Sequence, residues 1–389
     1  MKDKDYYEEL CKFYEIALGD IPHRGDFKEA LRRTVAIEDL KVFFLLPLTG
    51  SITLTKLKKK AKMPADELEK VLTRLASEGF IMTYRTERDY AYERGNPVFM
   101  AEQQVRKKKE TPQRALFAKF FNALIEGKTP GGLPTKTPYY RVLPAEPAVV
   151  EASALRTVDV NAVIPDARGV LPVDVITEMV RKDGDLIGVG ECFCRKTKQV
   201  LGEGCGHPVE TCFVFNEMAQ TLIEHGFARK IDYDEAVQIL RNCEDRGLVH
   251  NVDNCEGQIQ SLCNCCSCCC LLLKSASRGE TYAEAPSRYV VDFDPERCRG
   301  CQVCISRCPL GLRSVVEGKV VVNEERCIGC GLCAATCPSG ASKMVPRKKV
   351  EKIPRSHGEL YDRLGREALV SFARKKISQK LTGVIAKRS

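Results

Sequence analysis

A short cysteine pattern occurs twice toward the C-terminal end of this 389-residue chain, at residues 298–309 and 327–338. Both copies read C-x2-C-x2-C-x3-C-P. The cysteines are Cys298, Cys301, Cys304 and Cys308 in the first copy and Cys327, Cys330, Cys333 and Cys337 in the second. Cysteines three residues apart in a tight loop can direct three thiolates at one centre, and glycines allow the loop to wrap closely around it. The repeat therefore predicts two neighbouring thiolate-bound metal centres, with Gly300, Gly329 and Gly331 in their loops.

This doubled run resembles that of bacterial two-cluster ferredoxins, and the resemblance covers residues 286–345. In that family the fourth cysteine of each run binds the other cluster. The resemblance implies two [4Fe–4S] clusters, which transfer single electrons at potentials on the order of −400 mV. It assigns Cys298, Cys301, Cys304 and Cys337 to one cluster and Cys327, Cys330, Cys333 and Cys308 to the other. A zinc ribbon is disfavoured, because a zinc site needs only one set of four ligands.

The region before this repeat is also rich in cysteine, and six of the eight residues from Cys263 to Cys270 are cysteines. No secretory signal begins the chain, so we interpret these thiols as ligands rather than disulfides. The candidates for one extra metal site are Cys192, Cys194, Cys205, Cys212, Cys263, Cys265, Cys266, Cys268, Cys269 and Cys270. A third iron–sulfur cluster is the favoured occupant, and zinc, a redox-active dithiol or an organic-cofactor site are the alternatives.

Other residues near these cysteines have simpler interpretations. Cys11 and Cys243 are predicted to be buried packing residues. His207 and His250 are predicted to form ordinary hydrogen bonds rather than to bind metal. Residues 187–272 resemble the cysteine-rich part of uncharacterised ferredoxin-domain proteins from anaerobic bacteria and archaea, which supports iron–sulfur electron transfer and supplies no substrate.

Charge and hydropathy indicate where the protein is located and what its C-terminal tail could bind. No apolar stretch is long enough to span a membrane, and we expect a cytoplasmic protein from a low-oxygen environment. The net charge of +9 lies in residues 345–389, which hold thirteen Lys and Arg against four Asp and Glu. A predicted amphipathic helix from about residue 359 includes Leu360, Leu364, Leu369, Val370, Phe372 and Ile377 on its apolar side. We expect this tail to dock an acidic redox partner, in preference to a peripheral membrane contact.

Residues 35–95 predict three helices followed by a hairpin, an order that resembles a winged helix-turn-helix domain. In such domains the exposed start of the third helix reads DNA. Here those positions are Asp66, Glu67, Glu69 and Lys70, and the acidic side chains would repel phosphates. We therefore expect no binding to nucleic acid and a role in packing.

The sequence predicts a modular α+β protein with a winged-helix-like domain, a cysteine-rich middle domain and a two-cluster ferredoxin fold. Helices are predicted over 172–184, 208–226 and 232–247, and a strand over 185–195. The predicted divisions are an N-terminal helical segment (1–34), the winged-helix-like domain (35–95), a linker (96–145), the cysteine-rich domain (146–285), the ferredoxin domain (286–345) and the basic tail (346–389).

These features predict an electron-transfer protein that serves as donor or subunit for an anaerobic oxidoreductase. The sequence has no dinucleotide fingerprint, Walker loop or obvious catalytic triad, which favours a carrier over a self-contained enzyme. Two alternatives stay open: a redox-sensing transcriptional regulator, and a reductase with its active site in the cysteine-rich domain. No catalytic residue is assigned.

Overall fold

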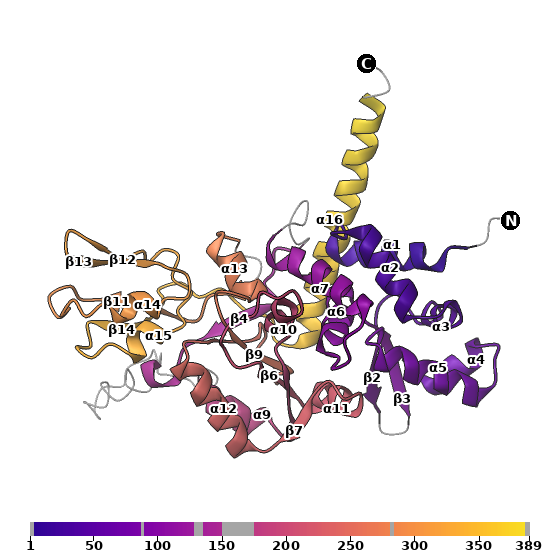
Figure 1. The fold of residues 1–389 in the computed structure, drawn as a ribbon, viewed down its shortest axis with the longest axis horizontal. Helices are drawn as coiled ribbons and strands as arrows, with labels where there is room; N and C mark the ends of the chain where they lie inside the picture. The colour runs from indigo at the N-terminus through magenta and orange to yellow at the C-terminus, as the bar shows by residue number, and fades with distance from the viewer. Residues whose placement is uncertain (1–3, 87–88, 128–134, 150–174, 281–283, 386–389) are drawn as a thin grey trace.

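A computed structural model describes residues 4–86, 89–127, 135–149, 175–280 and 284–385 (Figure 1). Helices and strands both form large parts of this structure, and the predicted α+β class is confirmed. A seven-stranded sheet occupies the middle. The helical N-terminal part lies on one side of it, and two small two-stranded sheets lie on the other.

The N-terminal part combines helices with a three-stranded antiparallel sheet in the order β1-β3-β2. Its elements are α1 (Tyr6–Leu18), α2 (Arg24–Thr34), α3 (Ile37–Phe43), β1 (Ile52–Thr53), α4 (Leu54–Lys60), α5 (Ala65–Ser77), β2 (Ile81–Arg85) and β3 (Tyr90–Arg94). Asp5 and Thr53 cap α1 and α4 by accepting backbone N–H hydrogen bonds. The predicted succession of three helices and a hairpin is present, although residues 87–88 of the hairpin turn lie outside the described residues.

The prediction of an irregular linker over 96–145 is wrong for most of its length. Residues 97–125 form two helices, α6 (Pro97–Arg106) and α7 (Pro112–Ile125), and residues 140–143 form β4 (Tyr140–Leu143). Each proline occupies the first turn of its helix, where no intrahelical N–H bond is lost, and Asn96 and Thr111 provide the caps. Residues 128–134 of the predicted linker lie outside the described residues.

The central sheet has the strand order β10-β4-β8-β9-β6-β5-β7, and only the β10–β4 pair is parallel among these described strands. The remaining strands are β5 (Ile187–Glu191), β6 (Glu210–Phe215), β7 (Arg229–Ile231), β8 (Val249–Asp253), β9 (Ser261–Cys265) and β10 (Glu284–Ala285). The associated helices are α9 (Ile176–Asp183), α10 (Phe193–Val200), α11 (Asn216–Glu224), α12 (Tyr233–Asp245) and α13 (Leu271–Ser277). Part of the predicted 146–285 domain, residues 150–174, lies outside the described residues.

Two sequence predictions fail in this sheet. The single helix expected over 208–226 divides into strand β6 and helix α11, because the β-branched and aromatic run "TCFVF" is buried on both faces. The strand expected over 185–195 ends at Glu191, and α10 begins two residues later. Helices α9 and α12 lie within the predicted ranges, though residues 172–174 are not described.

The C-terminal part contains two similar halves. Strand β11 (Tyr289–Phe293) pairs with β14 (Ser342–Pro346), and β12 (Arg313–Val316) pairs with β13 (Lys319–Val322). One short helix contains the third cysteine of each run: α14 (Val303–Ser306) contains Cys304, and α15 (Leu332–Ala335) contains Cys333. Helix α16 (His357–Ile385) then leaves this part and extends away from the body (Figure 1).

Helix α16 begins against the central sheet. His357 Nε2 lies 3.3 Å from Asp253 Oδ2, and the Glu367 carboxylate accepts hydrogen bonds from the Thr137 hydroxyl and backbone N–H. The predicted apolar side is not one covered face, because Leu360 is buried whereas Leu369 and Ile377 are exposed. No helix in the described part of the chain is long and apolar enough to cross a membrane.

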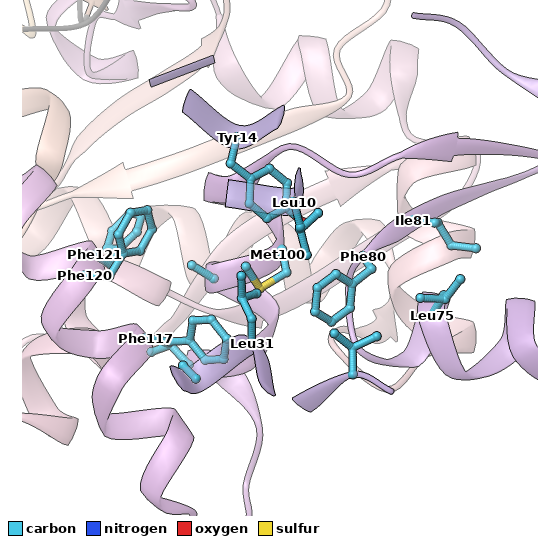
Figure 2. Close-up of a cluster of buried hydrophobic side chains, with 14 of the residues drawn as sticks. Leu10, Tyr14, Leu31, Leu75, Phe80, Ile81, Met100, Phe117, Phe120 and Phe121 are labelled. Carbon is cyan, nitrogen blue, oxygen red and sulfur yellow. The ribbon is translucent and has the colours of Figure 1, made fainter. Parts of the chain in front are cut away.

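One hydrophobic core joins the N-terminal helices to the cysteine-rich domain. Figure 2 shows its aromatic part, where Tyr14, Phe117 and Phe120 are almost completely buried. Burial of one such side chain contributes about 1.5–3 kcal/mol. The same cluster contains Cys192, Cys194, Cys212, Cys266 and Cys269. The N-terminal part therefore covers the cysteines of the middle domain.

Candidate metal centres

Two cavities lie between the paired strands of the C-terminal part, and each is lined by four cysteines. The first is lined by Cys298, Cys301, Cys304 and Cys337. The second is lined by Cys308, Cys327, Cys330 and Cys333. The structure thus places the last cysteine of each run beside the first three of the other. We call these the outer and the inner cavity.

Local backbone geometry explains this grouping. Gln302 and Gly331 both adopt positive φ angles, of 61° and 72°, directly before α14 and α15. At each of these residues the chain reverses, so that the first three cysteines of a run line the same cavity. The short helix then leads to the fourth cysteine, which lines the other cavity. Gly329 is required in the same loop: its φ is +71°, and a Cβ atom there would overlap Tyr289 O and Ser287 Oγ.

The two cavities differ in exposure to solvent. Cys301 at the outer cavity is exposed, whereas Cys330 at the inner cavity is 8% exposed. Contacts with the middle domain cover the inner cavity, and one is a hydrogen bond of 2.9 Å from Ala145 N to Cys330 O. Arg307 at the mouth of this cavity donates to the Glu244 and Asp245 carbonyls. The inner cavity therefore faces the cysteine-rich domain and the outer cavity faces away from it.

The surroundings of both cavities suit anionic thiolates. Arg313 is 4% exposed and faces cysteines of both sets. Burial opposes its charge, but the thiols of Cys333, Cys304 and Cys308 raise the pKa of this guanidinium above its usual value. Backbone N–H groups also reach sulfur: Gly300 N lies 3.4 Å from Cys298 Sγ, and Leu312 N lies 3.3 Å from Cys308 Sγ. Soft thiolate donors with N–H and guanidinium partners fit an iron–sulfur cluster.

The ten candidate cysteines of the middle domain do not all lie together in the structure. Four of them form a compact group, the cysteine tetrad: Cys205, Cys266, Cys268 and Cys269. Their sulfur atoms all lie within 4.8 Å of one another, and those of Cys268 and Cys269 are 3.7 Å apart.

The other six form a closed ring in which each thiol contacts two others. In order, the cysteine ring is Cys192, Cys194, Cys270, Cys265, Cys263 and Cys212. Two strands supply one half of it. Cys212 on β6 pairs directly with Cys263 on β9, and Cys265 follows on the same face of β9. The start of α10 supplies Cys192 and Cys194, and Cys270 directly precedes α13.

These contacts shift the pKa values of individual thiols. The Cys212 and Cys265 thiols lower the pKa of Cys263 to about 6. In the tetrad, the Cys269 thiol and the Arg195 guanidinium lower the pKa of Cys266 to about 5. Each group thus contains a thiol that is ionised near neutral pH, as metal binding requires.

Two buried arginines lie beside these groups, and the sequence analysis missed both. Arg195 is 1% exposed; it donates to Asn264 O at 3.0 Å and to the Thr211 hydroxyl. Burial opposes its charge, but nearby thiols raise its pKa above the usual range, with Cys192 and Cys266 among them. Arg106 is 9% exposed and lies near Cys192, Cys212 and Cys263. "Cys-x-Cys-Arg" was a local signal for Arg195, whereas nothing local indicated Arg106.

Cys11, Cys243 and His250 occupy the positions predicted for them. Cys11 and Cys243 are completely buried and belong to neither cysteine group. His250 is 1% exposed, and its ring lies 2.6 Å from Asn264 Oδ1 and 3.2 Å from Glu244 Oε1. It is therefore a core hydrogen-bonding residue. His207 is half-buried and lies outside the tetrad.

The comparison with protein families agrees with the C-terminal site. Residues 290–338 match the family described as a 4Fe-4S dicluster domain. The searches of curated proteins and of solved structures give no match. The chain therefore carries an iron–sulfur domain at the position of the two cavities, and the match leaves the rest of the chain unassigned. We call residues 290–338 the dicluster domain.

Proposed function

We propose that this protein transfers single electrons through two [4Fe–4S] clusters to or from a partner oxidoreductase. The supporting observation is the sorting of eight cysteines into two sets of four, each around its own cavity. We assign Cys298, Cys301, Cys304 and Cys337 to the cluster of the outer cavity. We assign Cys308, Cys327, Cys330 and Cys333 to that of the inner cavity.

Bound clusters of this type supply one-electron chemistry at low potential. The chain's own residues set the conditions for it. The eight thiolates hold the irons, and the N–H groups of Gly300 and Leu312 reduce the negative charge on two of the sulfurs. Arg313 offers a fixed positive charge between the two sets. Cys330 itself is nearly buried, whereas the other three thiols of the inner cavity are partly exposed.

We place the partner at the outer cavity. Cys301 is exposed there, Val303 at the same cavity is 39% exposed, and Val316 on the β12–β13 hairpin of the same domain is 52% exposed. An exposed ligand beside an apolar patch suits a transient redox contact, in which a short distance matters more than a large interface.

We assign residues 35–95 a winged-helix-like fold that serves packing. The hairpin that would form the wing is in contact with the cysteine-rich domain: the Thr221 hydroxyl donates to Thr83 O, and Thr83 Oγ1 lies 3.4 Å from His225 Nε2. At the presumed reading face, Lys58 is 2.7 Å from Glu69 in an ion pair. A docked wing disfavours DNA binding, and the Lys58–Glu69 ion pair reduces the positive charge of the basic helix α4.

A redox titration followed by electron paramagnetic resonance tests this proposal. We expect the anaerobically reconstituted full chain to take up two electrons at low potential, with signals of two interacting clusters. Cys301→Ser should alter one signal, and Cys330→Ser should alter the other. A protein that takes up no electron below about −200 mV would refute the proposal. The proposal would also be refuted if one of the two variants abolished both signals while the other variant changed neither signal.

A further inference from the structure

We propose that the cysteine-rich domain contains two separate metal sites of different size. In this proposal the cysteine tetrad binds one metal ion, Zn²⁺ or Fe²⁺, and the cysteine ring binds an iron–sulfur cluster with several irons. Neither site belongs to the dicluster domain, so the proposal goes beyond the function assigned to that domain.

The spacing of the tetrad fits a single ion. A tetrahedral metal with bonds of about 2.3 Å to sulfur sets its four sulfur atoms about 3.8 Å apart. The tetrad sulfurs lie within 4.8 Å of one another, and one pair is at 3.7 Å. A cubane cluster would place each thiolate on a different iron and would space them more widely. In the described residues, the cysteines of the two dicluster cavities form no set as compact as the tetrad.

The cysteine ring requires a larger occupant. One tetrahedral ion accepts four thiolates, but six thiols meet here in one closed circuit. No three of their sulfur atoms are as close together as those of the tetrad, so this arrangement does not match the spacing that one ion requires. Five of its members are less than 9% exposed, which excludes the water that would hydrolyse a cluster. Buried soft thiolates in this number are the donors that iron–sulfur clusters use.

Buried positive charge independently indicates anions at both sites. Arg195 contacts Cys266 of the tetrad and lies near Cys192 of the ring. No carboxylate in the described residues forms an ion pair with it, and its hydrogen bonds to Asn264 O and the Thr211 hydroxyl go to neutral acceptors. A guanidinium does not lose its proton, so burial without an anion would be costly. Metal-bound thiolates supply the missing negative charge. Arg106 lies near Cys212, Cys192 and Cys263 of the ring and also near the Glu102 carboxylate.

The ring lies beside the inner cavity. Cys265 and Cys270 share one hydrophobic cluster with Cys330 of the dicluster domain. If the proposed function holds, one electron passes from the cluster of the inner cavity to the cluster of the ring. The inner cluster is oxidised by one electron and the ring cluster is reduced by one electron. The existence of the two sites does not depend on this transfer.

Metal and sulfide analysis of full-length variants tests the proposal. The ring variant is Cys212→Ser/Cys263→Ser, and the tetrad variant is Cys205→Ser/Cys268→Ser. The matched control is Cys11→Ser/Cys243→Ser, which changes two fully buried cysteines that belong to neither site. Each protein is reconstituted anaerobically with iron, sulfide and zinc, and its iron, zinc and acid-labile sulfide per chain are measured.

We expect wild type and control to hold more than eight sulfides, since the dicluster domain accounts for about eight. The ring variant should lose equal amounts of iron and sulfide down to that level, while the metal of the tetrad stays. The tetrad variant should lose one metal ion and no sulfide. Wild type with eight sulfides would overturn the ring cluster. Equal iron and sulfide losses in the tetrad variant would overturn the division into two sites.

X-ray absorption of the wild type keeps the test decisive if a variant fails to fold. The tetrad metal should show four sulfur neighbours at about 2.3 Å and no metal neighbour. If zinc occupies it, the zinc edge reports this directly; if iron does, treatment that removes the clusters should leave one iron without sulfide. A metal neighbour in the tetrad spectrum would contradict the single-ion site. Loss of the dicluster signals alone would count against the proposed function and not against this inference.

Discussion

The dicluster domain and the cysteine-rich domain both gather thiols, but by different routes. In the dicluster domain, each set of four comes from two short runs with a fixed spacing. In the cysteine-rich domain, the ring takes its members from two strands and the starts of two helices that are distant in the sequence. The first arrangement is local and repeats, whereas the second exists only once the seven-stranded sheet has formed.

The two domains also differ in the positively charged groups that lie beside their thiols. Arg313 and backbone N–H groups face the dicluster cysteines, and the outer cavity opens to solvent at Cys301. The middle domain encloses its thiols and places Arg195 and Arg106 among them. We expect the sites of the middle domain to depend strongly on these arginines, and the dicluster sites to depend more on their loops.

The largest expected effect comes from Arg195→Met, which removes the cation between tetrad and ring. The thiolates would lose a buried counter-charge, so we expect the unfolding free energy to fall by about 3–5 kcal/mol. Metal of the middle domain should be lost with it, while the dicluster signals remain. Chemical denaturation and metal analysis measure both effects. Arg181→Met, at an exposed arginine stacked on Tyr233, is the control, and an equal loss in both variants would contradict the role of Arg195.

The next effect is expected from Gly329→Ala in the inner loop. The new Cβ would overlap the backbone of Tyr289 at a positive φ, so the cost should exceed the roughly 1–3 kcal/mol of the backbone conformation alone. Gly318→Ala is the matched control, because its φ is +76° and the space around it is open. Thermal unfolding and the signal of the inner cluster provide the measurements. Equal shifts in the two variants would show that the overlap has no consequence.

A smaller difference in stability is expected between the variants Cys330→Ser and Cys301→Ser. Both remove one proposed ligand, but only Cys330 is buried, and a buried hydroxyl without a partner costs about 1–3 kcal/mol. Thermal melts of the metal-free proteins should therefore show a lower Tm for Cys330→Ser alone. If Cys301→Ser lowers the Tm as much, the contrast between a covered inner and an open outer cavity is wrong.

The smallest effect expected is a pH dependence of the contact that attaches the start of α16 to the central sheet. Burial lowers the pKa of His357, but the Asp253 carboxylate and the Cys255 thiol outweigh it and raise the pKa to about 10. Because the folded-state pKa is raised, the stabilisation is complete below about pH 6.5 and is lost as the pH rises through about 10. Proteolysis at the start of α16 should become faster over that interval. His357→Gln should remove this pH dependence, and an unchanged profile in the variant would refute the assignment.

The sequence could predict the sites whose cysteines are set by a fixed spacing within short runs. It could not predict the sites whose cysteines come together only when the seven-stranded sheet has formed. The runs that include Cys298 and Cys327 carried enough information to propose the two ligand sets. The tract 263–270 did not, because its first half is a strand and its second half a turn, and this division separates Cys265 from Cys266. Pro97 and Pro112 begin helices α6 and α7, which the predicted linker over 96–145 did not include. Arg106 is 85 residues from the chain segment that it contacts at Glu191, so no local pattern could reveal it.

The iron, zinc and acid-labile sulfide content of the wild-type chain tests the central claim most directly. Our account predicts more than eight sulfides, iron in matching amount, and one further metal ion without sulfide. That result would mean that the locally encoded sites and the sites assembled by the fold both hold metal. A chain with about eight irons, eight sulfides and no other metal would contradict the account, because the thiols of the middle domain would then be packing residues or a reservoir of thiol redox chemistry.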